Sequence, residues 1–193
     1  IEAGAQLLIA EGTLIILDDA GVDMELNGTL NMSRGTLVIN GNMEVTPTGI
    51  INAGAADVFT GTGNLDIASS GSMNISNLGD PFTFDGGLIV NNSGSISLNS
   101  SSSTMILNGP FTKINNIGSF IWDGLVNIQF NGTNNAINNN EGAFYINGGG
   151  DLLSVGGSGA SFNNSMGAIL TKNGGSVTSI SNQVSFKNEG TVN

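Results

Sequence analysis

Residues 28–41 read GTLNMSRGTLVING, and this stretch contains one short unit twice. Each copy begins with Gly-Thr-Leu, and apolar side chains then alternate with small or polar ones: Leu30 and Met32 in the first copy, Leu37 and Ile39 in the second. Alternation with a period of two predicts a β-strand with one buried face and one face in water. The glycine and asparagine at the ends of each copy predict a sharp corner between strands.

The same unit recurs along the whole chain. Neighbouring copies are mostly seven or eight residues apart, and larger gaps are about twice as long; further copies begin at Gly12, Gly63, Gly71, Gly94, Gly118, Gly142, Gly175 and Gly190. A short unit repeated over the full length is typical of a protein built from stacked repeats. Three units make a coil of roughly 21–24 residues, so the chain is predicted to wind about eight coils.

These features predict an all-β protein, a single-stranded parallel β-helix (β-solenoid), with residues 1–193 forming one domain. Asn-Gly pairs, as at 27–28 and 40–41, also favour hairpins, so an antiparallel sandwich is the competing interpretation. Sandwich strands recur every 8–12 residues, whereas these recur faster. Residues 77–84, 100–104 and 134–141 are expected to be excursions at corners. Corner asparagines are expected to stack into ladders from one coil to the next.

The composition excludes several classes of function. Only 10% of the residues are charged, and four basic residues face fifteen acidic ones, for a net charge of −11. Binding to nucleic acid or to an anionic membrane surface is therefore not expected. The chain has no histidine and no cysteine, which removes Ser-His and Cys-His catalysis and the usual zinc sites. No apolar run is long enough to span a bilayer as a helix, and the first residues lack the charged stretch and following apolar stretch from which a signal peptide would be expected.

Two stretches invite a test for calcium binding. Asp18, Asp19, Asp23 and Glu25 form the densest acidic cluster, but their spacing does not match the twelve-residue calcium loop, and a solvated corner is the preferred interpretation. Residues 148–159 are similar to the calcium-binding nonapeptide repeat around Asp151, but the second copy has no acid at the matching place. We therefore predict no catalytic residue, no metal and no cofactor, and we do not expect an enzyme.

Other side chains have a structural and a functional interpretation. Trp122 alternates with Phe120, so it is expected in the core, although Trp122 and Tyr145 could also stack on a sugar. Chance is expected to produce several glycosylation sequons in a chain so rich in Asn, Ser and Thr, and they would matter only in a host that glycosylates exported proteins; they begin at Asn27, Asn31, Asn74, Asn91, Asn99, Asn131 and Asn163. Ranks of Thr-x-Thr, which an ice-binding face needs, are limited to Thr46–Thr48 and Thr60–Thr62.

Units such as Gly28-Thr-Leu-Asn-Met and Phe186-Lys-Asn-Glu-Gly-Thr-Val-Asn give the chain a family resemblance. It resembles large secreted bacterial β-solenoid proteins: autotransporter passengers, filamentous-haemagglutinin-like adhesins and related surface-repeat proteins. The resemblance covers nearly the whole chain, but it lies in the repeat pattern and not in an identifying motif. It therefore transfers no functional residue. It implies a right-handed helix, export to the cell surface, and a role in adhesion or in an extracellular fibre.

The expected function is therefore that of a non-catalytic structural or adhesive segment of an extracellular fibre. The alternative is a module that binds a glycan or host surface, and a polysaccharide lyase or hydrolase ranks behind both. Ile1 to Ala10 and Phe186 to Asn193 already have the repeat pattern and show no capping helix. The expected partners are further repeats of a longer chain or copies stacked end to end.

Overall fold

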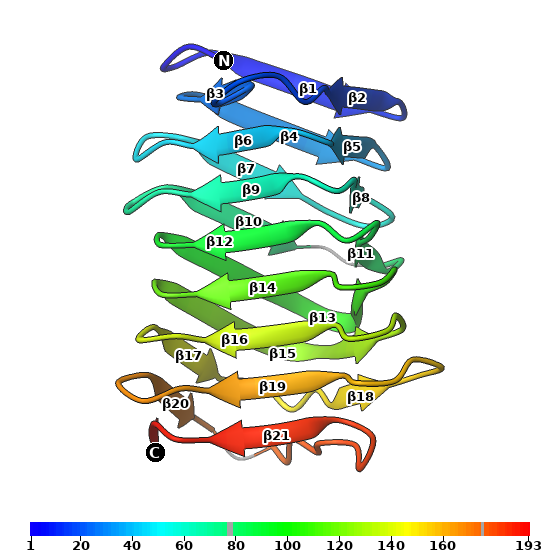
Figure 1. Cartoon of the computed structure of the whole chain (residues 1–193), viewed down its shortest axis with the longest axis vertical. Helices are drawn as coiled ribbons and strands as arrows, with labels where there is room; N and C mark the ends of the chain where they lie inside the picture. The colour runs from blue at the N-terminus through cyan, green and yellow to red at the C-terminus, as the bar shows by residue number, and fades with distance from the viewer. Residues whose placement is uncertain (77–78, 175) are drawn as a thin grey trace.

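The computed structural model describes residues 1–76, 79–174 and 176–193; the side chains of 101 and 102 are also left out of the description. The described residues contain no helix, and all paired strands run parallel. The chain winds as a β-solenoid of about eight turns, as predicted. Figure 1 shows the coils stacked from the N-terminus at the top to the C-terminus at the bottom.

Each coil passes over three faces, which we call the first, second and third face in chain order. The first face is built from β1 (Gln6–Ala10), β4 (Thr29–Ser33), β7 (Ile50–Ala53), β10 (Ser72–Ser76), the first part of β13 (Ser95–Leu107), the first part of β15 (Ser119–Phe130), β17 (Ala143–Ile146), β20 (Ile169–Lys172) and β22 (Thr191–Val192).

The second face follows at the next corner of each coil. It is built from β2 (Thr13–Ile16), β5 (Thr36–Ile39), β8 (Val58–Thr60), β11 (Phe82–Phe84), the later parts of β13 and β15, and β18 (Leu152–Ser154).

The third face is a separate sheet of eight strands, one for each turn. They are β3 (Met24–Leu26), β6 (Asn42–Val45), β9 (Asn64–Ile67), β12 (Ile89–Asn92), β14 (Lys113–Asn116), β16 (Ala136–Asn139), β19 (Ser161–Asn164) and β21 (Ser185–Asn188).

The strand register gives the length of each coil. Met24 pairs with Met43 and Ala143 pairs with Ile169, so between paired strands the repeat ranges from 19 residues (43 minus 24) to 26 residues (169 minus 143). The predicted range of 21–24 is therefore slightly too narrow. In Figure 1 the near strands of the third face run to the left and the far strands to the right while the chain descends, which is the right-handed sense.

The core is a stack of inward side chains that repeat from coil to coil. On the first face Leu30, Ile51, Met73 and Ile96 lie above one another and are fully buried. Burying one such side chain is worth about 1.5–3 kcal/mol. Trp122 is in the core as predicted, and its indole N–H donates to the Val126 carbonyl oxygen over 2.7 Å.

Three of the expected corner excursions are corrected in part. Ser100 to Thr104 forms no loop excursion: β13 continues through the corner from the first to the second face, with a break in register between Ser100 and Ser103. Residues 134–141 contain the regular strand β16. Of residues 77–84, the last three form β11, whereas 77 and 78 lie outside the described residues.

The Asn-Gly corners also need a different explanation at most positions. Gly109 and Gly174 have the positive φ that was expected, 68° and 91°. Gly148 does not, but a β-carbon there would overlap the Gly124 carbonyl oxygen of the preceding coil. Glycine is needed at Gly148 because coils stack directly on each other, so close approach rather than a left-handed backbone selects it.

Candidate functional site

The acidic cluster at residues 18–25 forms hydrogen bonds to the backbone around its own corner. The Asp23 carboxylate accepts hydrogen bonds from the backbone N–H groups of Asp19, over 2.9 Å, and Asn42, over 2.7 Å. The Asp19 carboxylate accepts from the Ala20 N–H over 2.8 Å. Within the described ranges, no group of three or more His, Cys, Asp or Glu side chains could hold a metal ion. Two of the four acids are therefore accounted for as turn-forming acceptors.

Asp151, the acid in the second calcium candidate, connects its own coil to the coils before and after it. Its carboxylate accepts from the Ser179 N–H over 2.9 Å, and its own N–H donates to the Asn127 side-chain oxygen over 2.9 Å. These contacts join neighbouring coils at a corner. The local arrangement is that of a structural link.

The predicted asparagine ladders are present, but most of their members lie within the stacked strands rather than at the Asn-Gly corners. The inner ladder joins Asn92, Asn116, Asn139, Asn164 and Asn188, the last residues of five successive third-face strands. Each Nδ2 donates to the Oδ1 of the next asparagine over 2.7–2.8 Å. The first four side chains are essentially inaccessible to solvent.

The inner ladder also fastens the corner into the following strand. The Asn116 Nδ2 donates to the Ala143 carbonyl oxygen over 3.2 Å, and the Asn139 Nδ2 donates to that of Ile169 over 3.0 Å. The ladder begins at Asn92, whose Oδ1 is buried without a hydrogen-bond partner among the residues that the structure describes. The residue paired with Asn92 in the preceding coil is Ile67, which has no donor on its side chain.

Sequence analysis missed this ladder, although a signal was present. Asparagine doublets recur at 91–92, 115–116, 138–139 and 163–164, one coil apart. Period-two geometry sends one member of each doublet inward and the other outward. The outward members form a second ladder. In it, the side-chain oxygens of Asn91, Asn115 and Asn138 each accept from the side-chain amide of the outward asparagine in the following coil, over 2.8–2.9 Å.

Several sequon asparagines are members of the outward rows. Asn91 donates to the Asp66 carboxylate over 2.7 Å, and Asn163 donates to Asn138 over 2.8 Å. On the first face, Asn74 donates to Asn52 over 3.0 Å and Asn52 donates to Asn31 over 2.9 Å. These amides connect coils, so their abundance has a structural cause.

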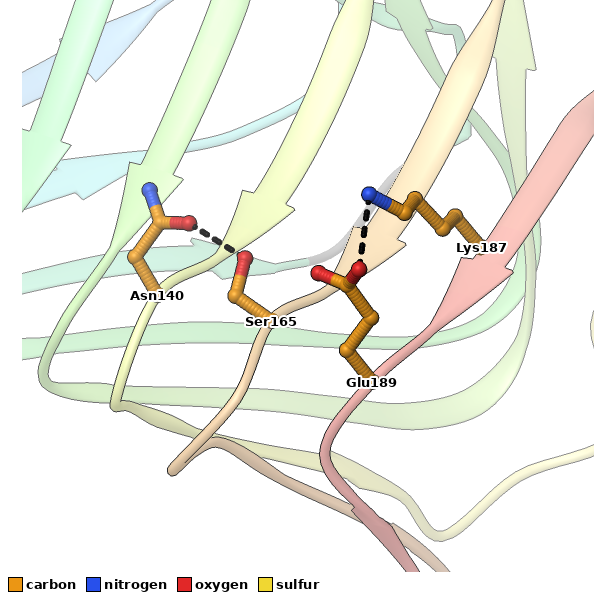
Figure 2. A network of polar contacts seen from close by, with 4 residues as sticks. All are labelled: Asn140, Ser165, Lys187 and Glu189. Carbon is orange, nitrogen blue, oxygen red and sulfur yellow. Dashed lines mark hydrogen bonds and ion pairs between the residues drawn. The ribbon is translucent and has the colours of Figure 1, made fainter.

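The four basic residues do not converge on one site. Arg34 is exposed at a corner of the second coil, and Lys113 is on the third face. The Lys172 ammonium donates to the Gly148 carbonyl oxygen over 2.7 Å. Lys187 forms an ion pair of 2.9 Å with Glu189, which Figure 2 shows beside the hydrogen bond of 2.8 Å between Asn140 and Ser165.

A polar hollow lies at the corner that leads from the first to the second face. Its volume is about 340 Å³, and its lining includes Asn31, Ser33, Arg34, Gly54 and Ser76. Extending the register of β4, β7 and β10 places Gly54 between Ser33 and Ser76. Gly54 has no side chain to fill the space, and a β-carbon there would meet nothing closer than 3.5 Å. The missing side chain therefore opens the hollow.

Asp57 holds the backbone behind this hollow. Its fully buried carboxylate accepts from the Gly35 N–H over 2.8 Å and from the Gly54 N–H over 2.7 Å. Burial raises the pKa of Asp57, and hydrogen bonds from the backbone of Gly54, Gly35 and Arg34 act in the opposite direction. One carboxylate thus ties together two corners that line or adjoin the hollow.

A second cavity, of about 410 Å³, lies near the C-terminal end of the core. Its lining is mainly apolar and includes Trp122, Leu152, Phe162, Leu170 and Phe186. In the last coils Val177 is 79% exposed and Val192 is 53% exposed. The core is therefore open at this end.

No helix among the described residues is long and apolar enough to cross a membrane. In comparisons with family models, curated proteins and solved structures, the chain matched none. The stacked parallel coils define it as a β-solenoid repeat protein.

Proposed function

We propose that the chain is a non-catalytic structural or adhesive segment of an extracellular or cell-surface bacterial fibre. The observation that carries the proposal is the uninterrupted stacking of the third face, where eight strands pair in register from β3 to β21. Backbone hydrogen bonds and amide ladders in such a stack run along the rod axis and make it stiff. The net charge of −11 keeps neighbouring rods apart.

The resemblance to autotransporter passengers and haemagglutinin-like adhesins supports the location and the adhesive role. Immunogold electron microscopy of intact source cells, with antibodies raised against the purified chain, tests both. We expect label on material outside the cell envelope. Label confined to the cell interior contradicts the proposal.

The proposed partners are further coils of a longer chain or another copy stacked end to end. The open C-terminal core supports this, because Phe186 is 42% exposed and Ile180 is 44% exposed there. Sedimentation of the purified chain and of Phe186→Glu tests for stacking, with Ile117→Glu as control because Ile117 is exposed on a corner in the middle of the rod. Concentration-dependent rods that only Phe186→Glu abolishes support stacking of copies, and a strictly monomeric wild type excludes it.

The second proposed function is that of a glycan-binding module, and the hollow beside Arg34 is the observation in its favour. A glycan array tests it, and a blank array at high protein concentration argues against it. A carbohydrate-active enzyme ranks behind both. Depolymerisation assays on acidic polysaccharides, with and without chelator, would reveal such an activity.

A further inference from the structure

The hollow beside Arg34 is lined by hydrogen-bond donors from neighbouring coils. Within the described structure, the Arg34 guanidinium has no hydrogen bond and no ion pair, and the hydroxyls of Ser33 and Ser76 are not engaged. Asn31 accepts from Asn52 at the start of its row, so its own amide N–H groups have no partner there. An arginine side chain alone offers five donors in a fixed fork that matches a carboxylate.

The floor of the hollow is apolar and the walls are held in place. Met32 and Ala53 lie at its base and are 7% and 4% exposed. The Asp57 carboxylate fixes the Gly54 and Gly35 N–H groups, so the two corners cannot shift independently. A preorganised wall reduces the ordering cost of binding. A volume of about 340 Å³ lies at the lower end of the range for small-molecule sites.

The geometry points to a binding subsite for an acidic saccharide, in which Arg34 holds a sugar carboxylate and Asn31, Ser33 and Ser76 donate to neighbouring hydroxyls. This inference rests on the second proposed function, the glycan-binding module. The apolar base suits the C–H face of a sugar ring. The outward amide row Asn31–Asn52–Asn74 continues away from the hollow and offers polar contacts to further sugar units.

One neighbouring charge opposes the ligand. Glu11 occupies the corner position of Arg34 in the preceding coil, since Thr13 pairs with Thr36, and its N–H donates to the Ser33 carbonyl oxygen over 3.0 Å. Glu11 and Arg34 form no ion pair. A carboxylate on Glu11 disfavours an anion in the hollow. Replacing Glu11 by a neutral residue therefore tests whether the ligand is negatively charged.

The experiment compares two ligands that differ only in the carboxylate. Isothermal titration calorimetry is carried out with the trimer of β-1,4-linked glucuronate and with cellotriose, its neutral counterpart. We expect measurable binding of the uronate trimer, binding of cellotriose that is at least about tenfold weaker, and loss of affinity with added salt. Equal affinity for the two trimers, or no binding of the uronate trimer, overturns the inference.

Variants of the hollow locate the binding. Arg34→Asn is expected to weaken uronate binding at least about tenfold and Arg34→Lys less so, because lysine keeps the charge but loses the fork. Glu11→Gln is expected to strengthen binding. Gly54→Val is expected to fill the hollow, because Gly54 has no positive φ and a β-carbon there meets no atom closer than 3.5 Å. Lys113→Gln, which removes a charge on the third face, is the matched control.

The outcomes separate this inference from the functions on which it rests. If the uronate trimer binds equally well to wild type, Arg34→Asn and Gly54→Val, the chain is a glycan-binding module but the hollow is not its site. If Arg34→Asn and Lys113→Gln weaken binding alike, the effect is one of general charge and the subsite is disproved. Circular dichroism melts of each variant confirm that the comparison is made between folded proteins.

Discussion

The side-chain amide of Asn116 donates a hydrogen bond of 2.7 Å to the amide oxygen of Asn139, and neither side chain is accessible to solvent. Both side chains point into the solenoid, at positions that Val45 and Ile67 occupy in earlier coils. From Asn92 onward, this column of the core therefore changes from dispersion contacts to hydrogen bonds. The amides of Asn116, Asn139 and Asn164 are each both donor and acceptor in the ladder, so each of these asparagines depends on its neighbours in the coils before and after it.

The first prediction concerns removal of one rung. Asn116→Ala leaves the Asn139 oxygen, one N–H of Asn92 and the Ala143 carbonyl group without their partner. Each unsatisfied buried group costs about 1–3 kcal/mol, so we expect the free energy of unfolding to fall by about 3 kcal/mol or more. Urea denaturation measures it.

The adjacent residue provides the control for this prediction. Asn115 belongs to the outward ladder, is partly exposed, and can replace lost partners with water. Asn115→Ala is therefore expected to cost about 1 kcal/mol or less. Equal losses for the two variants would mean that burial does not set the strength of the ladders.

The second prediction concerns the first rung. Ile67→Asn places an amide next to the buried, unpartnered oxygen of Asn92. Val45→Asn places the same amide one coil earlier, opposite Ile67, where it finds no side-chain partner. Both variants lose apolar burial, but we expect Ile67→Asn to be less destabilised, by about 1–2 kcal/mol, because it completes a hydrogen bond. Thermal and urea unfolding measure the stability of both variants. A smaller loss of unfolding free energy for Val45→Asn than for Ile67→Asn would contradict the geometry.

The period-two pattern was sufficient to predict the stacked strands, because each inward residue of one coil recurs in the next. Met73 and Ile96, for example, hold the same position in the copies that begin at Gly71 and Gly94, and they are stacked. The run Ser100–Ser103 could not be interpreted in this way. It has no apolar residue to mark the inward face, so the passage of β13 across a corner was invisible in the sequence.

The hollow beside Arg34 was also beyond sequence analysis. It depends on Gly54 lying between Ser33 and Ser76, residues that are 21 and 22 positions away along the chain. Coil lengths between paired strands vary from 19 to 26 residues, so the spacing alone did not give the register. The inner ladder was closer to prediction, since its asparagine doublets recur once per coil from Asn91 onward.

The third prediction separates two reasons for glycine. In Gly148→Ala the new β-carbon would overlap the Gly124 carbonyl oxygen, so the coils must move apart locally. We expect a loss of about 1–3 kcal/mol, the usual cost of overpacking. Gly12→Ala meets no atom within 4 Å and has no positive φ, so we expect a neutral or slightly stabilising effect. Similar melting temperatures for the two variants would show that close approach does not select glycine at Gly148.

The last prediction concerns pH and Asp57. Burial raises the pKa of this carboxyl in the folded chain above the 3.8 of an ordinary aspartate. Between 3.8 and the raised value the folded state holds a proton that the unfolded state has released, so Asp57 makes the free energy of unfolding fall as pH rises. Asp57→Asn does not titrate and lacks this contribution. Urea denaturation between about pH 3.5 and about pH 7 should therefore show the wild type losing stability relative to Asp57→Asn as pH rises. A wild type that gains stability relative to the variant over this interval would mean that hydrogen bonds from Gly35 and Gly54 outweigh desolvation at Asp57.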